Sequence, residues 1–552
     1  MRSPLVVMAT LIGLLVALPV LSVGANLLAG DTGSTWSHLA STVLPEYVLN
    51  SLLLSLGVGL GVALLGVSTA WFTAMTDFPG RRVFEWALLL PLAMPAYVMA
   101  YVYTDLLQFV GPIQTFLRES FAWRRGDYWF PEIRSLGGAM LMFICVLYPY
   151  VYLLARTAFL ERGSGTFEAA RSLGLSPWSA FYRVSLPLAR PAVAAGVALV
   201  LMETLADYGT VAYFSVPTFT TGIYRAWFSL GDRVAAAQLA GALLTFVLLL
   251  LAMERLSRGR ARFHETGRRV GERRPLAGWH AWAAHAVCQL PLLLGFLLPA
   301  GLLLKLALEE GDSDFGVRYV VLAKNSLLVA GITALLAVLL AILLAYGLRL
   351  AQEQRGAGGR GAALFARMAN RVVGLGYAVP GSVIAVGVLI PVTRLDHWLG
   401  ARWLEWFGTN PGLILTGTVA ALIYAYLARF LAIALHTIDS GLARVTPSMD
   451  AAAKSLGCGP LETLRRVHVP LLRGSVFSAG LLVFVDVMKE LPATLVMRPF
   501  NFDTLATQTY TLAADERLAE ASTAALAIVA VGLLPVMFLA RQVAKGKAGS
   551  AC

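Results

Sequence analysis

The chain has 552 residues, of which 58% are hydrophobic and 14% charged, and its mean hydropathy is +0.71. A water-soluble domain needs a largely polar outer surface, so this composition excludes that class and favours a membrane protein. The formal net charge of +12 does not indicate nucleic-acid binding. The basic residues lie in loops between apolar stretches, which is the pattern of the positive-inside rule.

Apolar stretches long enough to cross a bilayer predict an all-α polytopic membrane protein with about twelve spans. In the first half we expect helices at 5–28, 48–74, 84–105, 136–160, 191–214 and 235–254. In the second half we expect them at 281–307, 321–348, 372–393, 412–436, 475–497 and 521–540. The first stretch is longer than a typical signal-peptide core, so it is expected to remain as the first membrane helix.

Basic residues set the expected orientation of these spans. The segment 255–278 is rich in arginine and is expected to be a cytoplasmic linker between a first half, 1–254, and a second half, 279–552. Arginines in 349–371 and the basic residues after 540 fall on the same side when twelve spans are counted, which places both termini in the cytoplasm. The 106–135 loop also contains arginines, but longer loops follow the rule less strictly, and we expect it outside.

The two halves carry matching short motifs in the same order. Ser172-Leu173-Gly174 reappears 283 residues later as Ser455-Leu456-Gly457, and Pro187 reappears at the same distance as Pro470. Asn-Ser pairs open the second and eighth spans, at 50–51 and 325–326. Because both halves have the same orientation, they indicate a parallel repeat with a pseudo-two-fold axis along the membrane normal and a pathway between the halves.

The loops after the fourth and tenth spans, at about 161–190 and 438–473, carry the clearest of these matches. The first contains Glu168, Ala169, Ala170, Gly174 and Pro187, and the second contains Asp450, Ala451, Ala452, Gly457 and Pro470. Alanine favours a short helix, and glycine at the helix end permits left-handed backbone. Proline is expected to break the chain before the next span. Each loop is therefore predicted to be a rigid helix–turn–helix that transmits a conformational change from a bound partner.

These two loops resemble the E-A-A loop of ATP-binding-cassette (ABC) importer permeases, in which Gly and Leu-Pro follow at fixed spacing. The resemblance implies that the residues named above dock a cytoplasmic ATPase, which we expect in two copies. The second loop has Ala451 in place of the glutamate, with Asp450 one position earlier, so unequal docking is expected. The chain contains no G-x-x-x-x-G-K-[ST] motif, so ATP and Mg²⁺ are expected on the partner. We expect this chain to bind no cofactor and not to be an enzyme.

Two pairs of carboxylates lie inside expected spans, where ionisable groups are costly and suggest function. Glu203 and Asp207 are one helical turn apart, and Asp486 and Glu490 repeat them 283 residues later, with Lys489 beside them. We expect these five residues to line the translocation pathway, with the four carboxylates as a ring that favours a hard cation. The alternative is structural: capping of backbone beside helix breaks, or pairing with Lys489.

The sequence around these carboxylates, together with 91–97 and 502–506, is similar to the fused ferric-iron ABC permeases of bacteria. That similarity implies a periplasmic binding protein as partner and a location in the bacterial inner membrane. Fused permeases for thiamine, phosphonates and polyamines share the layout, so another substrate stays open.

An ion-coupled secondary transporter would also have two halves and intramembrane carboxylates, but it would need no ATPase-docking loops. Tyr97, Tyr101 and Tyr103 cluster in the third span and are expected to be interfacial anchors. No residue is assigned as a metal ligand.

Overall fold

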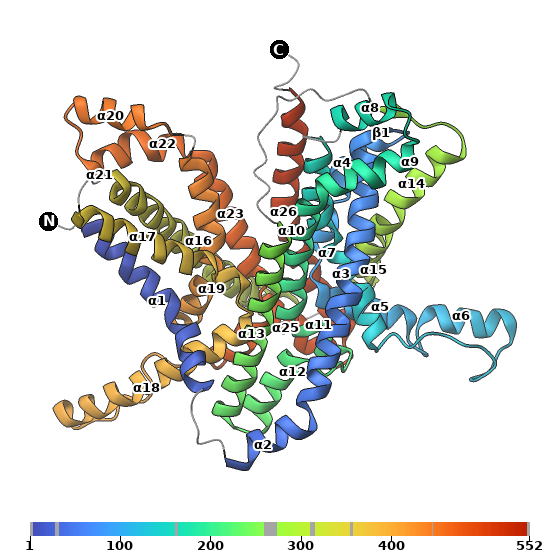
Figure 1. Ribbon diagram of the computed structural model, residues 1–552. Coiled ribbons are helices and arrows are strands. Elements are labelled where there is room, and N and C mark those ends of the chain that lie inside the picture. The colour runs from blue at the N-terminus through green and yellow to red at the C-terminus, as the bar shows by residue number, and fades with distance from the viewer. Residues whose placement is uncertain are drawn as a thin grey trace. The chain divides into compact units, whose positions relative to one another are not determined.

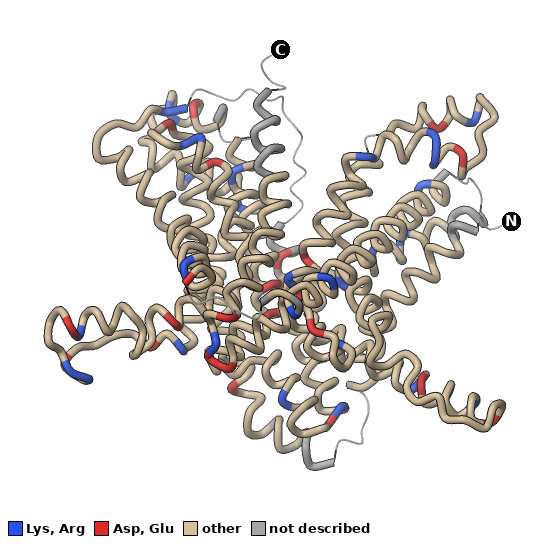
Figure 2. Tube along the Cα trace, turned by 180° about the vertical axis from the view of Figure 1, so that it is seen from behind, with Lys and Arg blue, Asp and Glu red and all other residues tan. Residues whose placement is uncertain are grey.

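The computed structural model describes residues 4–27, 33–160, 164–258, 273–309, 315–353, 357–443 and 445–548. Ten of its helices are long and apolar enough to cross a membrane, and two bent helix pairs raise the number of spans to twelve if each pair is one span. The expected all-α membrane fold is therefore confirmed. Figure 2 shows that charged residues gather mainly in loops and short helices and are sparse along the long helices.

The helices follow one another as shown in Figure 1. The first half contains α1 (Pro4–Leu27), α2 (Gly33–Thr42), α3 (Leu44–Met75), α4 (Arg81–Ala87), η1 (Leu90–Ala93), α5 (Ala96–Leu107), α6 (Pro112–Phe121), α7 (Leu136–Ala158), α8 (Ser164–Ser172), α9 (Pro177–Ala180), η3 (Phe181–Ser185), α10 (Leu186–Ala206), α11 (Gly209–Tyr213), α12 (Phe219–Tyr224), η4 (Arg225–Ser229) and α13 (Arg233–Arg258).

The second half contains α14 (Trp279–Leu292), η5 (Leu293–Leu297), α15 (Leu298–Glu309), α16 (Phe315–Glu353), α17 (Ala357–Gly374), η6 (Gly376–Ala378), α18 (Gly381–Phe407), α19 (Val419–Leu442), α20 (Pro447–Ser455), α21 (Pro460–Thr463), η7 (Leu464–His468), α22 (Val469–Leu471), α23 (Arg473–Met488), α24 (Pro492–Met497), α25 (Leu505–Ala514) and α26 (Leu518–Ala548). Short strands β1 (Thr76–Asp77) and β2 (Arg274–Pro275) pair in parallel.

The helices form two compact units that do not coincide with the sequence halves. One unit contains the described residues within 1–36, 223–244 and 316–507, and the other contains those within 37–222, 245–315 and 508–552. Accordingly, α1 packs on α17, α18 and α19, whereas α14, α15 and α26 pack on α4, α5 or η1 of the first half. Each unit thus combines the central helices of one half with end helices of the other.

Small residues allow the central helices of the second unit to approach closely. A Cβ atom added at Gly66 of α3 would lie 2.6 Å from Cβ of Val151 on α7, and one added at Gly196 of α10 would lie 2.8 Å from Cα of Val151. Contacts of this kind are how membrane helices gain packing energy, since lipid tails are as apolar as the side chains they replace.

Four expected spans are not single helices, which corrects the sequence-based boundaries. In the third span, η1 and α5 meet at a 90° bend beside Pro95. The ninth is interrupted before Pro380, the fifth at Asp207 and the eleventh before Pro492. Proline lacks an N–H donor and disfavours helical backbone in the preceding residue, which explains three of these breaks.

The predicted linker at 255–278 falls mostly on residues 259–272, which lie outside the described residues. The basic side chains after 540 also lie outside the part of the chain whose side chains are described. At the far end of the linker, Arg273 Nε donates to the Ala74 carbonyl at 3.2 Å, next to the β1–β2 pair. This end of the linker is therefore fastened to the end of α3.

Candidate functional site

Both E-A-A-like loops fold as two short helices joined by a tight turn. Gly174 and Gly457 have φ angles of +90° and +82°, as expected for glycine beyond a helix end. In the first loop, the N–H groups of Gly174 and Leu175 donate to the carbonyls of Arg171 and Ala170 at 3.0 and 3.1 Å. The second loop makes the same two bonds at the matching positions, both at 3.0 Å. The two loops therefore repeat each other in backbone geometry as well as in sequence.

The first helix of each loop, α8 or α20, has a solvent-exposed face. Glu168 and Ala169 of α8 are exposed, and Ala170 is buried against the body of the unit. Ala451 and Ala452 of α20 are likewise exposed. The exposed faces hold residues that we predicted to dock an ATPase, and their role stays a prediction.

Exposed apolar residues stand beside these faces at matching positions, and sequence reasoning missed them. Leu173 is 85% exposed and Leu456 is 83% exposed. Trp178 and its counterpart Leu461 are 66% and 70% exposed. Each pair has the 283-residue offset of the repeat, and that offset is the signal that could have revealed them. Large apolar side chains left in water at a loop suit a protein-binding surface.

The expected break at Pro187 is wrong, whereas the chain does bend after Pro470. The segment from Pro177 to Ala206 is one helix, because the π-helical turn η3 shifts the Leu186 N–H to the Phe181 carbonyl and accommodates the proline. In the second half, the helix that contains Pro470 meets α23 at a 77° bend.

An aromatic cluster fastens the first loop to the membrane helices. The Trp71 ring, near the end of α3, has its centroid 5.3 Å from that of Phe159, 5.4 Å from Phe167 and 4.6 Å from Phe181, in edge-on arrangements. Edge-to-face ring contacts of this kind contribute beyond the apolar area they bury. The cluster therefore links α8 to the end of α3, the end of α7 and η3.

A polar cluster occupies the equivalent place in the second loop. Arg349 of α16 donates to Asp450 Oδ2 from Nε at 2.8 Å and from Nη2 at 2.6 Å, and it donates to the Leu442 and Val445 carbonyls. His468 Nε2 lies 2.6 Å from Asp450 Oδ1. Asp450, predicted as a substitute docking acid, is instead buried with its carboxylate turned inward.

The surroundings of Asp450 favour its charged form. Burial raises the pKa of the carboxyl, but the hydrogen bonds from Arg349 and His468 lower it by more, so the pKa lies below its ordinary value. Tyr346 completes the cluster by donating to the Pro460 carbonyl at 2.6 Å. The carboxylate therefore links α16, α20 and η7 in place of the aromatic rings of the first half.

Asp207 in the first half and Glu490 in the second each cap a short helix that follows a helix break. Asp207 Oδ1 accepts from the Thr210 N–H at 2.8 Å, at the start of α11. Glu490 accepts from the Ala493 and Thr494 N–H groups at 2.9 and 3.0 Å, at the start of α24. The structural alternative considered from the sequence thus holds for these two residues, without excluding a place on the pathway.

The two halves differ in what neutralises these carboxylates. Glu490 is 4% exposed and forms an ion pair of 3.3 Å with the buried Arg429. Asp486 pairs with Lys489 at 3.0 Å, as the sequence alternative anticipated. Glu203 and Asp207, both half-buried, lie close enough to interact electrostatically. Within the residues that the structure describes, no three His, Cys, Asp or Glu gather as a metal site. A ring of all four carboxylates stays a prediction.

The three tyrosines of the third span are not interfacial anchors, contrary to the expectation. Tyr97, Tyr101 and Tyr103 are 3%, 1% and 5% exposed and pack inside their unit. The Tyr103 hydroxyl donates to the Leu294 carbonyl at 2.6 Å. Sequence alone cannot tell the two cases apart, because an interfacial tyrosine and a buried one occur in equally apolar stretches.

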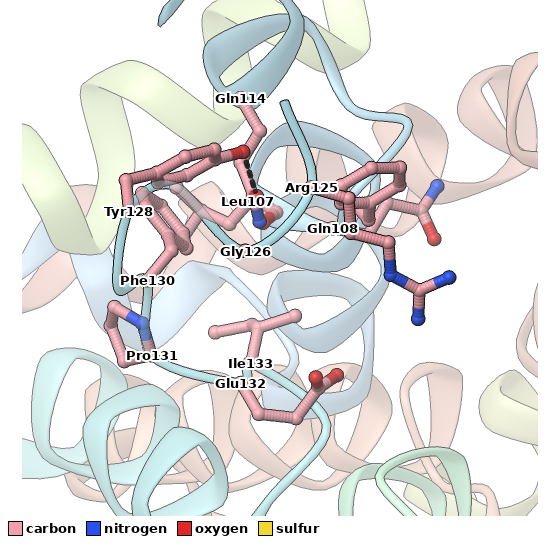
Figure 3. Close-up of a pocket in the computed structure, with 11 residues that line it drawn as sticks. Leu107, Gln108, Gln114, Arg125, Gly126, Tyr128, Phe130, Pro131, Glu132 and Ile133 are labelled. Carbon is pink, nitrogen blue, oxygen red and sulfur yellow. Dashed lines mark hydrogen bonds between the residues drawn. The ribbon is translucent and has the colours of Figure 1, made fainter. Parts of the chain in front are cut away.

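A pocket of about 240 Å³ lies in the 106–135 segment. This segment is at the opposite end of α7 from the first E-A-A-like loop, which we call the first coupling loop. Tyr128 donates to Gln114 at 2.7 Å, and Gln114 donates to the Leu107 carbonyl at 2.8 Å. Figure 3 shows this linked pair on one side of the pocket and Arg125 on the other. The 23 residues of α7 span roughly 35 Å at ~1.5 Å per residue, about one membrane thickness.

Two matching helix–turn–helix loops on a repeated helical body are the features expected of a membrane permease that is driven by a partner. The family of binding-protein-dependent transport system inner membrane components matches residues 63–258 and 361–548. The chain belongs to this family, and its two matches confirm the internal repeat. It is therefore an ABC-transporter permease subunit, a class of transport protein rather than of enzyme.

Three relatives illustrate the range of the family. An Fe(3+)-transport system permease protein of Haemophilus influenzae is 26% identical over 98% of each chain. A ferric transport system permease protein of Actinobacillus pleuropneumoniae is 24% identical over 83% of this chain and 65% of the relative. A molybdenum transport system permease protein of Escherichia coli is 29% identical over 36% of this chain and 87% of the relative.

Proposed function

We propose that this permease moves ferric iron into the cytoplasm. The observation that carries the proposal is the alignment with an Fe(3+)-transport permease along 98% of both chains, so that both halves and both coupling loops correspond. Half-buried carboxylates within the helices add support, because hard, highly charged cations prefer oxygen ligands.

The proposed machine has three further parts. A periplasmic binding protein delivers the ion at the outer side, where the 106–135 segment lies. Two copies of a cytoplasmic ATPase, which bind ATP and Mg²⁺, dock on the α8–α9 and α20–α21 loops. The chain resides in the bacterial inner membrane with both termini in the cytoplasm. Twelve spans, with each bent pair counted as one, support that orientation.

Within this machine, Glu203, Asp207, Asp486, Lys489 and Glu490 belong to the pathway. Asp207 and Glu490 cap the short helices α11 and α24, and Lys489 offsets the charge of Asp486.

A different substrate is the competing proposal, because molybdenum and sulfate permeases also align with this chain. Their alignments cover only 36% and 37% of it. Carboxylates along a pathway also oppose the passage of an oxyanion, since like charges repel in a low-dielectric surrounding. A secondary transporter is disfavoured by the two docking loops.

The test is reconstitution of the chain in proteoliposomes with its ATPase and binding protein. We expect ATP-dependent uptake of radioactive ferric iron, and no uptake or ATP hydrolysis by the chain alone. Unlabelled molybdate, sulfate, thiamine and spermidine serve as competitors. Uptake of one of these in place of iron, or transport without the ATPase, would contradict the proposal.

A further inference from the structure

Three oxygen-bearing side chains from separate helices converge near the break in the fifth span. Tyr101 belongs to α5, Asp207 ends α10 and Tyr510 belongs to α25. The Tyr101 ring packs edge-on against Tyr213 of α11, the helix that Asp207 caps, with ring centroids 4.6 Å apart. The Tyr510 ring packs beside that of Tyr208, the chain neighbour of Asp207, with centroids 5.9 Å apart. All of these residues belong to the same compact unit.

The Tyr101 hydroxyl is the unusual member of this cluster. It is fully buried, and within the described part of the chain it has no hydrogen-bond partner. Two other buried tyrosines of the same unit have bonded hydroxyls: Tyr148 donates to the Leu88 carbonyl at 3.1 Å, and Tyr152 donates to the Glu85 carbonyl at 3.0 Å. An unpaired buried hydroxyl is costly, so a group kept in that state points to a ligand that pairs with it.

Asp207 is the only formal charge among the three. Among the described residues, its neighbours other than the tyrosines are Thr210, Val211, Thr220 and Glu203, and none of these is basic. Capping of α11 uses Oδ1 and leaves further lone pairs on the carboxylate.

The second half lacks this arrangement at the equivalent place. There Glu490 is neutralised by Arg429, and alignment of Pro380 with Pro95 puts Val386 where the third span has Tyr101. The oxygen cluster therefore stands at the break in the fifth span and not at the break in the eleventh, which the symmetric sequence pattern of carboxylates did not suggest.

We propose that Tyr101, Asp207 and Tyr510 form a one-sided, transient binding site for a hard trivalent cation on its way through the permease. The inference rests on the proposed function and deepens it by naming the residues that contact the ion. Phenolate and carboxylate oxygens are suitable ligands for such an ion. A phenol that binds as phenolate loses its proton to the water that the ion sheds.

Weak binding suits a transport site. An ion must bind well enough to enter and loosely enough to leave. One resident carboxylate supplies a single negative charge, and the two phenols balance the rest only while they are deprotonated, so their reprotonation releases the ion. The site therefore holds the ion briefly rather than storing it.

The experiment titrates the purified full-length chain in nanodiscs with ferric nitrilotriacetate. Phenolate bound to Fe³⁺ absorbs visible light through ligand-to-metal charge transfer, which reports the tyrosines directly. We expect the band in the wild-type chain, and about tenfold weaker binding after Tyr101→Phe, Tyr510→Phe or Asp207→Asn, the lower end of what the loss of one supporting group costs a metal site. Tyr101→Phe removes an unpaired hydroxyl, so the protein should fold at least as stably.

Two variants serve as controls. Tyr103→Phe lies on the same helix, but its hydroxyl is bonded to Leu294, so the band should stay as in the wild type. Tyr148→Phe removes a second buried hydroxyl that is already bonded, to the Leu88 carbonyl, and should also leave the band unchanged.

Uptake of radioactive iron by the complete transporter is measured in parallel. A wild-type chain that transports iron without the band, or a band that survives Tyr101→Phe and Tyr510→Phe, would overturn the site and leave the proposed function standing. A chain that neither binds nor transports ferric iron overturns both.

Discussion

Arg349 and Asp450, 101 residues apart in the chain, meet through two hydrogen bonds of 2.8 and 2.6 Å to one carboxylate oxygen. The corresponding position in the first half is Phe167, which packs edge-on against Trp71. The two coupling loops thus have the same backbone geometry and differ in how they are fastened. One attachment is apolar, and the other depends on charge.

Removal of the carboxylate should loosen the second loop. Asp450→Ala leaves Arg349 partly buried without its ion pair, which we expect to cost about 3 kcal/mol of unfolding free energy. Differential scanning fluorimetry of the purified chain measures the shift in melting temperature. Glu462→Ala, which removes an exposed ion pair with Arg466 in the same loop, is the matched control and should change little. Equal shifts for the two variants would contradict the role given to Asp450.

The same carboxylate predicts a pH dependence. Its pKa in the folded protein is lower than in the unfolded chain, so its stabilising contribution is complete above the ordinary carboxyl pKa of about 4 and is lost as pH falls through the folded value. The difference in melting temperature between wild type and Asp450→Asn should therefore shrink as the pH falls below about 4. A difference that stays constant down to the lowest accessible pH would rule out this contribution.

Glu168 should act on the partner and not on the fold. Its side chain is exposed on α8, so Glu168→Ala should leave the melting temperature unchanged and weaken ATPase binding by about 1 kcal/mol, as expected for one interface residue. Co-purification of the ATPase with the chain measures this effect. Glu119→Ala, an exposed glutamate on the outer helix α6, should have no effect on either quantity. Full retention of the ATPase by the Glu168 variant would remove Glu168 from the docking surface.

The exposed leucines of the two loops should contribute to docking as a matched pair. Leu173→Ser and Leu456→Ser remove apolar surface that water now covers, so each should reduce ATPase retention without lowering the stability of the chain alone. Phe500→Ser provides the control, since Phe500 is 94% exposed in the loop after α24. Were Phe500→Ser to reduce retention as strongly, general surface hydrophobicity and not these loops would explain the result.

The ion pair between Arg429 and Glu490 should be structural. Glu490→Ala leaves a buried guanidinium without its partner and removes the cap of α24, and we expect a loss of about 3 kcal/mol or more. Replacing both residues, as in Arg429→Met with Glu490→Met, should recover part of that loss, because no charge then stays buried alone. Thermal unfolding of the three variants gives the comparison. Additive losses in the double variant would show that the two residues do not act as a pair.

Local sequence signals anticipated the repeated features well. Gly174 and Gly457 adopt the left-handed backbone inferred for them, and helix breaks do lie beside the carboxylates, at Asp207 and before Pro492. These outcomes depend on short-range chemistry: a glycine without Cβ strain, or a proline without an N–H donor.

Contacts between residues that are distant in the chain could not be predicted from the sequence. The sequence suggested that Asp450 docks the ATPase in place of the missing glutamate. Its ion pair with Arg349 could not be foreseen, because the two residues are far apart in the chain. The burial of Tyr101 depends on which helix covers its face, and the sequence pattern of one helix does not specify that neighbour. Pro187 was misjudged because a single π-helical turn suffices to keep its helix continuous.

The exchange of end helices between the halves bears on how the protein is made. α1 buries Ala9, Val16 and Val23 in a unit whose other helices, α17 and α18, begin more than 300 residues later. At ~5–20 residues per second of synthesis, the first helix waits in the bilayer for tens of seconds before its neighbours exist. Contacts with α17 and α18 cannot guide its insertion, so α1 must enter and hold its orientation through its own hydrophobicity. Until more than half of the chain has been translated, α1 lies in the bilayer without the neighbours α17 and α18 against which it packs in the folded protein.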